Sequence, residues 1–256
     1  MNKDETTGDY NQTALSPKFG AVYQIIPEKF SVFANYMNGF KNVGGSSTQP
    51  DGSVRTFKPQ QANQVEGGFK ASLFDGKLVG SVSYYDIYVT KVTRPDPEQA
   101  GFTIQDGDIY SRGFELDITA NPVAGLSIIA GYSYNDSENK KTSPSIEGRR
   151  PVAAGPENLI NGWISYTIQS GAAKGLGFGF GGNYAGDNVI TNSAETGKFT
   201  IPSYTILNAT AFYNTGGAFY FGLKVDNLAN TKYWKGWSTV EPQKLRQVIG
   251  NISFHF

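Results

Sequence analysis

The sequence predicts an all-β protein whose strands form the wall of an antiparallel transmembrane β-barrel. About eleven segments alternate apolar and polar residues with a period of two, the repeat of a strand with two different faces. The connections between these segments are alternately short and long, which is typical of barrels with short periplasmic turns and long extracellular loops. Helical periodicity is weak throughout the chain, so no helix longer than two turns is expected.

Length and composition exclude several classes of protein. The 256 residues suffice for one large all-β unit, and 22 Lys and Arg balance 22 Asp and Glu, so no basic stripe predicts a nucleic-acid partner. Cysteine is absent, which excludes disulfides and thiolate metal sites. The single histidine, His255, lies at the second-last position, so no serine has an evident base and no catalytic residue is assigned. The mean hydropathy of −0.35 is compatible with a membrane barrel, whose strands average out as polar.

The strands are expected in chain order, with boundaries uncertain by a few residues. They are residues 14–26, 30–41, 60–74, 78–92, 109–120, 126–138, 158–170, 176–190, 203–215, 219–232 and 244–256. The tight turns are residues 27–29, 75–77, 121–125, 171–175 and 214–217. The long, polar connections are residues 42–59, 93–108, 139–157, 191–202 and 233–243. Such sorting of loops by length predicts a barrel with two different rims.

The two faces of a strand can be read directly from the alternation. Phe114, Leu116 and Ile118 point one way, while Glu115 and Asp117 point the other. About eleven apolar faces would need a very large dry interior, which a single sheet of this length cannot fill. An apolar outer face in lipid and a wet, charged lumen are therefore predicted.

Some aromatic and charged residues suggest specific sites but have ordinary explanations. Five tyrosines near strand ends fit an interfacial girdle on the lipid side: Tyr23, Tyr36, Tyr132, Tyr134 and Tyr166. In strand 78–92, the neighbouring residues Tyr84 and Tyr85 would each assign the apolar face to a different set of alternate positions. A bulge between them would resolve this. The run Asp106-Gly107-Asp108 lacks the twelve-residue loop of a calcium site, so a turn is expected and no metal site is assigned.

The end of the chain carries a family resemblance. Residues 225–256 resemble the ending of TonB-dependent siderophore receptors, with five matching positions: Asn227, Leu228, Tyr233, Arg246 and Phe256. Residues 16–41, 57–70 and 110–134 are similar to further strands of that family, and residues 147–167 are similar to its ferric-hydroxamate-type members. The usual Pro-Arg before the last strand stands here as Leu245-Arg246. The matches follow the family's order over nearly the whole chain.

The resemblance implies a particular architecture. The family barrel has about twenty-two strands, with an N-terminal plug inside the barrel and a TonB box before the plug. Residues 1–256 are therefore expected to be the C-terminal part of the barrel, without plug or TonB box. The polar start of the chain does not resemble a signal peptide, which agrees with a truncated chain.

The resemblance also implies a function and partners. The parent receptor is expected to take up a ferric siderophore across the outer membrane of a Gram-negative bacterium, driven by the TonB complex through the plug. Its expected partners are the siderophore, outer-membrane lipid and the outer-membrane assembly machinery, with no cofactor. Three alternatives remain open: a passive porin, an adhesin or structural barrel, or a TonB-dependent receptor for another scarce nutrient such as a cobalamin or a glycan.

Two sets of residues are candidates for sites. Siderophore receptors commonly line their external pocket with aromatic side chains, so the resemblance favours Trp234 and Trp237, with Phe102 and Tyr110 behind them. The hydroxamate preference rests on resemblance around residues 149–151. Four alternate positions of the last strand fit the signal read by the assembly machinery in the family: Gly250, Ile252, Phe254 and Phe256.

Overall fold

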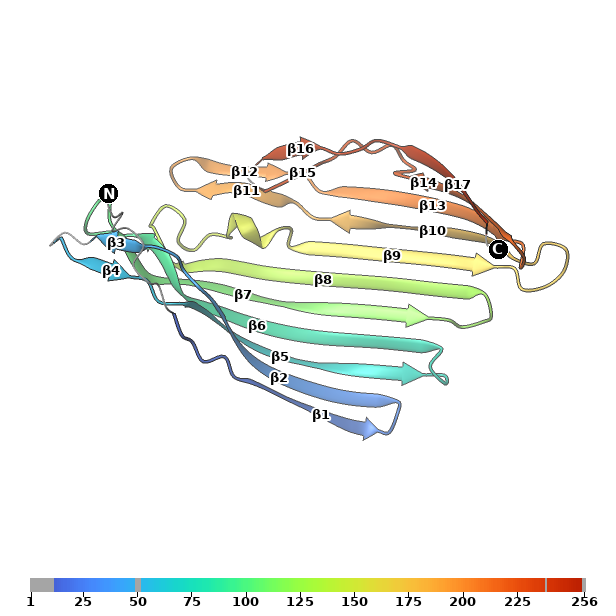
Figure 1. Ribbon diagram of the computed structural model, residues 1–256, viewed down its shortest axis with the longest axis horizontal. Coiled ribbons are helices and arrows are strands. Elements are labelled where there is room, and N and C mark those ends of the chain that lie inside the picture. Colours follow the sequence, from blue (N-terminus) through green and yellow to red (C-terminus); the bar gives the residue numbers. More distant parts are fainter. Residues whose placement is uncertain (1–11, 49–51, 238, 255–256) are drawn as a thin grey trace, which may run out of the picture.

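A computed structural model describes residues 12–48, 52–237 and 239–254 of the chain. Eleven strands form one antiparallel sheet in the order β1-β2-β5-β6-β7-β8-β9-β10-β13-β14-β17, so neighbours in the sheet follow one another along the chain (Figure 1). The first six are β1 Lys18–Ile26, β2 Phe30–Lys41, β5 Gln60–Leu73, β6 Leu78–Pro95, β7 Thr103–Ala120 and β8 Leu126–Lys141. The other five are β9 Asn158–Thr167, β10 Leu176–Ala185, β13 Tyr204–Asn214, β14 Phe219–Asp226 and β17 Gln247–Phe254. Each strand expected from the sequence is present, and the all-β prediction is confirmed.

The two ends of the sheet differ, as the loop lengths predict. Tight turns join strands at one end, and all the small hairpins lie at the other end, here called the loop end (Figure 1). The hairpins are β3 Ser46–Thr48 with β4 Val54–Thr56, β11 Asn188–Ser193 with β12 Gly197–Ile201, and β15 Trp234–Gly236 with β16 Val240–Pro242. A single 3-10 turn, η1 Val152–Ala154, lies in a loop. Within the described residues no helix is long and apolar enough to cross a membrane.

One predicted long loop is wrong. Residues 93–108 were expected to connect two strands, but β6 continues to Pro95 and β7 begins at Thr103, leaving a connection of residues 96–102. The extension is held by polar pairs, such as the ion pair of 2.6 Å between Arg94 Nε and Asp106 Oδ1. Because both faces of a strand are polar where it leaves the apolar zone, the alternation that identifies a strand disappears there.

The register assigns every strand residue to one of two faces. The apolar face carries Phe114, which lies opposite Tyr84 and Tyr134 on the neighbouring strands. The polar face carries the intervening residues, including Glu115 and Asp117. The expected tyrosines also lie on the apolar face. Pairing is continuous from Leu78 to Val89, so no bulge separates Tyr84 from Tyr85, and the register shifts between Val89 and Thr93 instead.

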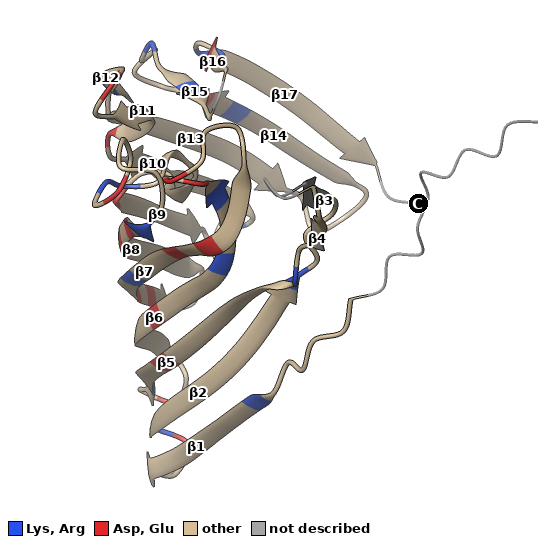
Figure 2. Cartoon of the chain, turned by 90° about the vertical axis from the view of Figure 1, so that its left-hand side faces the viewer, with Lys and Arg blue, Asp and Glu red and all other residues tan. Residues whose placement is uncertain are grey.

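The sheet is open. Its edge strands are β1 and β17, which lie at the two ends of a curved wall and do not pair with each other in the described structure (Figure 2). All nine residues of β1 are exposed, and most of β17 is exposed too. Each edge strand therefore presents one row of backbone groups that the sheet itself leaves available for pairing with another strand.

Candidate functional site

The apolar face ends at one level near the loop end. Arg112 lies two residues before Phe114, on the same face of β7. It is opposite Asp86 on β6 and Asp136 on β8. Arg112 and Asp136 form an ion pair of 3.0 Å. The residues of the apolar face between this level and the tight turns form the apolar belt. Beyond the belt, toward the loop end, this face also carries charged side chains such as Arg112 and Asp136. The loop end therefore extends past the apolar belt.

The tryptophan candidates lie on the third hairpin. Trp234 begins β15, lies opposite Pro242 on β16 and is 43% exposed. Trp237 follows the strand and is 65% exposed. Two large, exposed aromatic side chains at the loop end can stack on a flat ligand. The predicted ligand contact of Trp234 and Trp237 therefore stands as a proposal.

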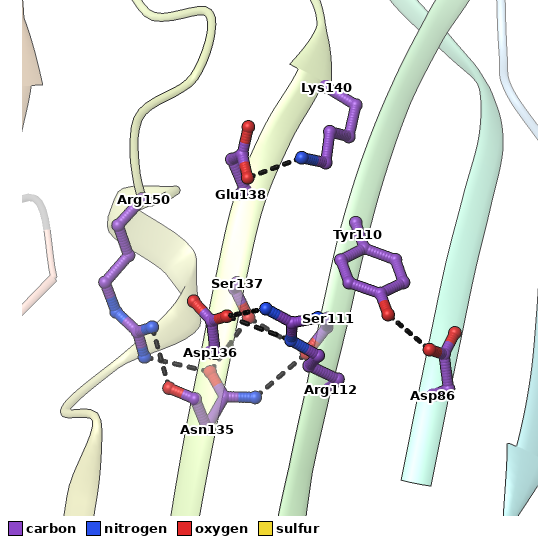
Figure 3. A network of polar contacts seen from close by, with 10 residues as sticks. All are labelled: Asp86, Tyr110, Ser111, Arg112, Asn135, Asp136, Ser137, Glu138, Lys140 and Arg150. Carbon is purple, nitrogen blue, oxygen red and sulfur yellow. Dashed lines mark hydrogen bonds and ion pairs between the residues drawn. The ribbon is translucent and has the colours of Figure 1, made fainter.

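The other two candidates do not join the tryptophans in one place. Phe102 ends the 96–102 connection, where its carbonyl oxygen accepts a hydrogen bond of 2.9 Å from the Asp96 amide. Tyr110 lies on the same side of β7 as the apolar belt, with its ring 6.5 Å from that of Tyr88 and its hydroxyl bonded to Asp86 (Figure 3). The side chain of Tyr110 therefore lies on the outer face of the sheet, and its predicted role in ligand binding stays a prediction.

The structure reveals an aromatic group that the sequence reading did not select. The rings of Tyr204 and Tyr233 lie 4.6 Å apart, and Lys235 Nζ lies 5.7 and 5.8 Å from the two ring centroids. Tyr204 is the first residue of β13 and shares the polar face with Ile206 and Asn208. Strand parity could have placed Tyr204, but only folding of the loop brings Tyr233 over it.

The predicted lumen charges lie on the polar face, as expected. Lys224 pairs with Asp226 of its own strand at 2.9 Å, and Lys70 lies 5.0 Å from the ring centroid of Phe33. Lys224 thus pairs with a residue two positions along its own strand, not with a neighbouring strand. Among the residues that the structure describes, no group of three or more His, Cys, Asp or Glu could hold a metal ion.

The assembly-signal residues follow the predicted parity. Gly250, Ile252 and Phe254 pair with Leu223, Phe221 and Phe219 of the apolar face, in that order. Ile252 is 72% exposed, and the ring of Phe254 lies tilted against that of Phe219, with 5.1 Å between the centroids. Phe256 lies outside the described residues. The role of these positions in assembly stays a prediction, because lipid contact alone would require the same alternation.

Loop residues fold back over the polar face and are tied to it. Arg150 donates hydrogen bonds to the backbone oxygen of Asn135 and to its Oδ1, both at 2.8 Å (Figure 3). It also donates to the Gly155 carbonyl at 3.0 Å. Asn135 in turn bonds Tyr85 and Ser111 of the polar face. Burial lowers the pKa of Arg150, since desolvation disfavours its charge. Arg149 and Arg150, on which the hydroxamate preference rests, are thus engaged with other protein groups.

Comparison with known proteins agrees with this geometry. The family described as "TonB dependent receptor-like, beta-barrel" matches residues 2–228. The chain is 29% identical over 231 residues to the metal-pseudopaline receptor CntO of Pseudomonas aeruginosa, covering 90% of this chain and 32% of that protein. It is 28% identical over 249 residues to the ferrichrome outer membrane transporter/phage receptor of Escherichia coli, covering 93% and 32%.

Solved structures show the same fold. BauA, the ferric preacinetobactin receptor of Acinetobacter baumannii, superimposes with a TM-score of 0.81 at 21% identity, over 98% of this chain and 38% of that one. The chain therefore spans about a third of the length of the curated relatives that it matches. Because the family match covers most of the chain and the strand order and loop arrangement agree with it, the chain belongs to the TonB-dependent receptor β-barrel family.

Proposed function

We propose that the chain forms part of an outer-membrane receptor that takes up a ferric siderophore, driven by the TonB complex through a plug domain of the whole protein. The observation that carries the proposal is one continuous sheet with an apolar face, a polar face and all its long loops at one end. Lipid satisfies the apolar face, and the polar face lines a wet interior. Relatives named as receptors for ferrichrome and ferrioxamine support the ligand class.

The test uses the whole receptor in a Gram-negative strain that lacks its own receptor. We expect uptake of radioactive iron from a ferric siderophore panel, with ferric hydroxamates preferred, and loss of uptake when TonB is deleted. Uptake that persists without TonB would instead indicate a passive porin. A cobalamin or a glycan taken up in place of all ferric siderophores would assign the receptor to another nutrient.

The hairpin β15–β16 supplies the proposed ligand contacts. Stacking of an aromatic anchor on a ligand contributes about 1–3 kcal/mol, so Trp234→Ala and Trp237→Ala should each weaken siderophore binding about tenfold. Binding is measured by calorimetry on the purified whole receptor, because the variants remove tryptophans that fluorescence quenching would report. Phe74→Ala is the control, because Phe74 is an exposed aromatic in the tight turn between β5 and β6, at the opposite end of the sheet. Unchanged affinity in both tryptophan variants would move the site to Tyr204 and Tyr233 or to other parts of the receptor.

A further inference from the structure

The buried apolar side chains of the described chain gather at the loop end. Four side chains are only 3–6% exposed: Ala185, Val189, Ile201 and Ile206. They come from the end of β10, both strands of hairpin β11–β12 and the start of β13. A sheet that meets lipid on one face and water on the other has no need of a dry core. A small core under a loop hairpin instead indicates that the hairpin is a folded unit.

A chain of hydrogen bonds ties neighbouring loops to this hairpin. Asn192 of β11 accepts from Arg149 Nη1 at 3.3 Å and donates to the Arg150 carbonyl at 3.1 Å. The Ala194 amide donates to the Ser145 carbonyl at 2.7 Å. Hairpin β11–β12 and loop 142–157 are therefore joined near the tip of the hairpin.

The third loop joins at the other end of the hairpin. Asn188, the first residue of β11, donates from Nδ2 to the Gly236 carbonyl of β15 at 3.0 Å. The links thus run from the barrel wall through three loops: residues 142–157, 186–203 and 227–243, which we call the loop cap. The tryptophans proposed to contact ligand belong to its last member.

Arg150 anchors the loop cap to the wall. Its guanidinium reaches Asn135 on β8 and Gly155 beyond η1 at the same time, through neutral oxygens. A planar fork of donors can bridge such separated acceptors, whereas a lysine ammonium is a compact point charge. Replacing Arg150 leaves these half-buried acceptors without their partner and should loosen the loop. The loop then keeps only its backbone bonds to β8, such as that of 3.0 Å from the Asn139 amide to the Arg149 carbonyl.

We propose that the loop cap is folded before ligand arrives and forms a rigid wall of the binding mouth, with Arg150 as the residue that positions it. The ligand part of this proposal rests on the proposed function, and the rigidity does not. A preformed surface binds without the entropic cost of ordering loops, so the cap favours slow release of ligand.

Hydrogen exchange of the whole receptor without ligand tests the rigidity. We expect amides of β11, β12 and loop 142–157 to be protected in the unmodified receptor. Arg150→Ala should speed exchange at least tenfold in loop 142–157 and also in β11–β12, which Arg150 does not itself contact through its side chain. Lys140→Ala is the matched control, since Lys140 pairs with Glu138 on the opposite face of β8 and should leave the cap unchanged. Faster exchange confined to loop 142–157, or an unprotected cap in the unmodified receptor, would overturn the proposal.

Three further variants keep the test decisive. Asn192→Ala removes the central link without touching the wall and should reproduce the spread of faster exchange, while Thr191→Ala next to it should not. Arg150→Lys keeps the charge and should behave like Arg150→Ala, since its single nitrogen cannot stand at the positions of both Nη1 and Nη2. For a ferric hydroxamate bound to the receptor, Arg150→Ala should raise the dissociation rate several-fold with little change in the association rate. If no siderophore binds the unmodified receptor, the proposed function fails while the exchange result still decides the rigidity.

Discussion

At the scale of single residues, aromatic rings and glycines on the polar face form cross-strand pairs. Each ring lies directly opposite a glycine of the adjacent strand. The pairs are Phe33 with Gly68, Tyr85 with Gly113, Trp163 with Gly181, and Phe212 with Gly177. A Cβ atom built on Gly181 would approach a Trp163 ring carbon to 2.7 Å and collide with the Gly162 carbonyl. These glycines are needed for space rather than for an unusual backbone angle.

Gly181→Ala should therefore lower the free energy of unfolding of the receptor by about 1–3 kcal/mol, the usual cost of forcing extra atoms into a packed site. Gly39→Ala on β2 is the matched control, because nothing lies within 4 Å of its added Cβ. Thermal or denaturant unfolding in detergent, followed by gel mobility, measures both variants. Equal stability of the two variants would show that Trp163 moves aside at no cost.

The ion pair between Arg94 and Asp106 should make the stability of the extended ends of β6 and β7 depend on pH. The hydrogen bond from Arg94, together with that from Lys141, lowers the pKa of Asp106 below its usual value of 3.8. A carboxyl with a lowered folded-state pKa stabilises the folded form above its usual pKa, and this contribution is lost as the pH falls through the folded-state value. Asp106 lies beyond the apolar belt, so the effect is local to residues 94–106.

Asp106→Asn should accordingly raise amide exchange of residues 94–106 at pH 7, relative to the unmodified receptor. The difference should shrink as the pH falls through the lowered folded-state pKa of Asp106, because the native carboxyl then becomes protonated as well. Exchange rates corrected for their intrinsic pH dependence measure this. A difference that does not change as the pH falls would mean that the charge of Asp106 is irrelevant to the extension.

At the scale of elements, each strand is defined by its two faces. Leu116 lies in the middle of the apolar belt of β7, between Phe114 and Ile118, and Glu115 and Asp117 point to the polar face. Successive residues of one strand thus meet solvents as different as lipid and water.

The same substitution should therefore have opposite consequences at adjacent positions of β7. Leu116→Lys places a charge against lipid and should cost about 2–4 kcal/mol of folding free energy, whereas Glu115→Lys should cost little. Folding into vesicles, titrated with denaturant, measures both. If the costs are similar, the assignment of the apolar face to lipid is wrong.

At the scale of the whole molecule, the open sheet limits what this chain does alone. Its edges β1 and β17 do not pair with each other in the described structure, so the sheet encloses no channel. Unpaired edges favour pairing with other chains. In the whole receptor, other strands would satisfy both edges.

Residues 1–256 expressed alone should thus fail to restore growth of an iron-starved receptor mutant on a ferric siderophore, although the whole receptor should restore it. The measurement is growth on a single siderophore as iron source, with surface exposure of both chains checked by immunoblotting. Growth supported by the short chain would contradict the need for a closed wall.

The sequence by itself determined the number and order of the strands, their antiparallel meander and the division into apolar and polar faces. These features rest on local alternation, such as that of residues 114–118, which a strand expresses wherever it lies. The sequence also carried the family, because its motifs occur in order along the chain.

Only the tertiary structure decided which polar segments continue a strand and which fold as loops. The extension of β6 and β7 depends on pairs such as Arg94 with Asp106, and the loop cap depends on Arg150 reaching Asn135 fifteen residues away. Polar residues carry no alternation that distinguishes strand from loop, so their structure follows from partners that are distant in sequence. Tyr110 is a different case, because the alternation along residues 110–114 already puts it on the face of Phe114, and only the structure shows that its hydroxyl bonds Asp86.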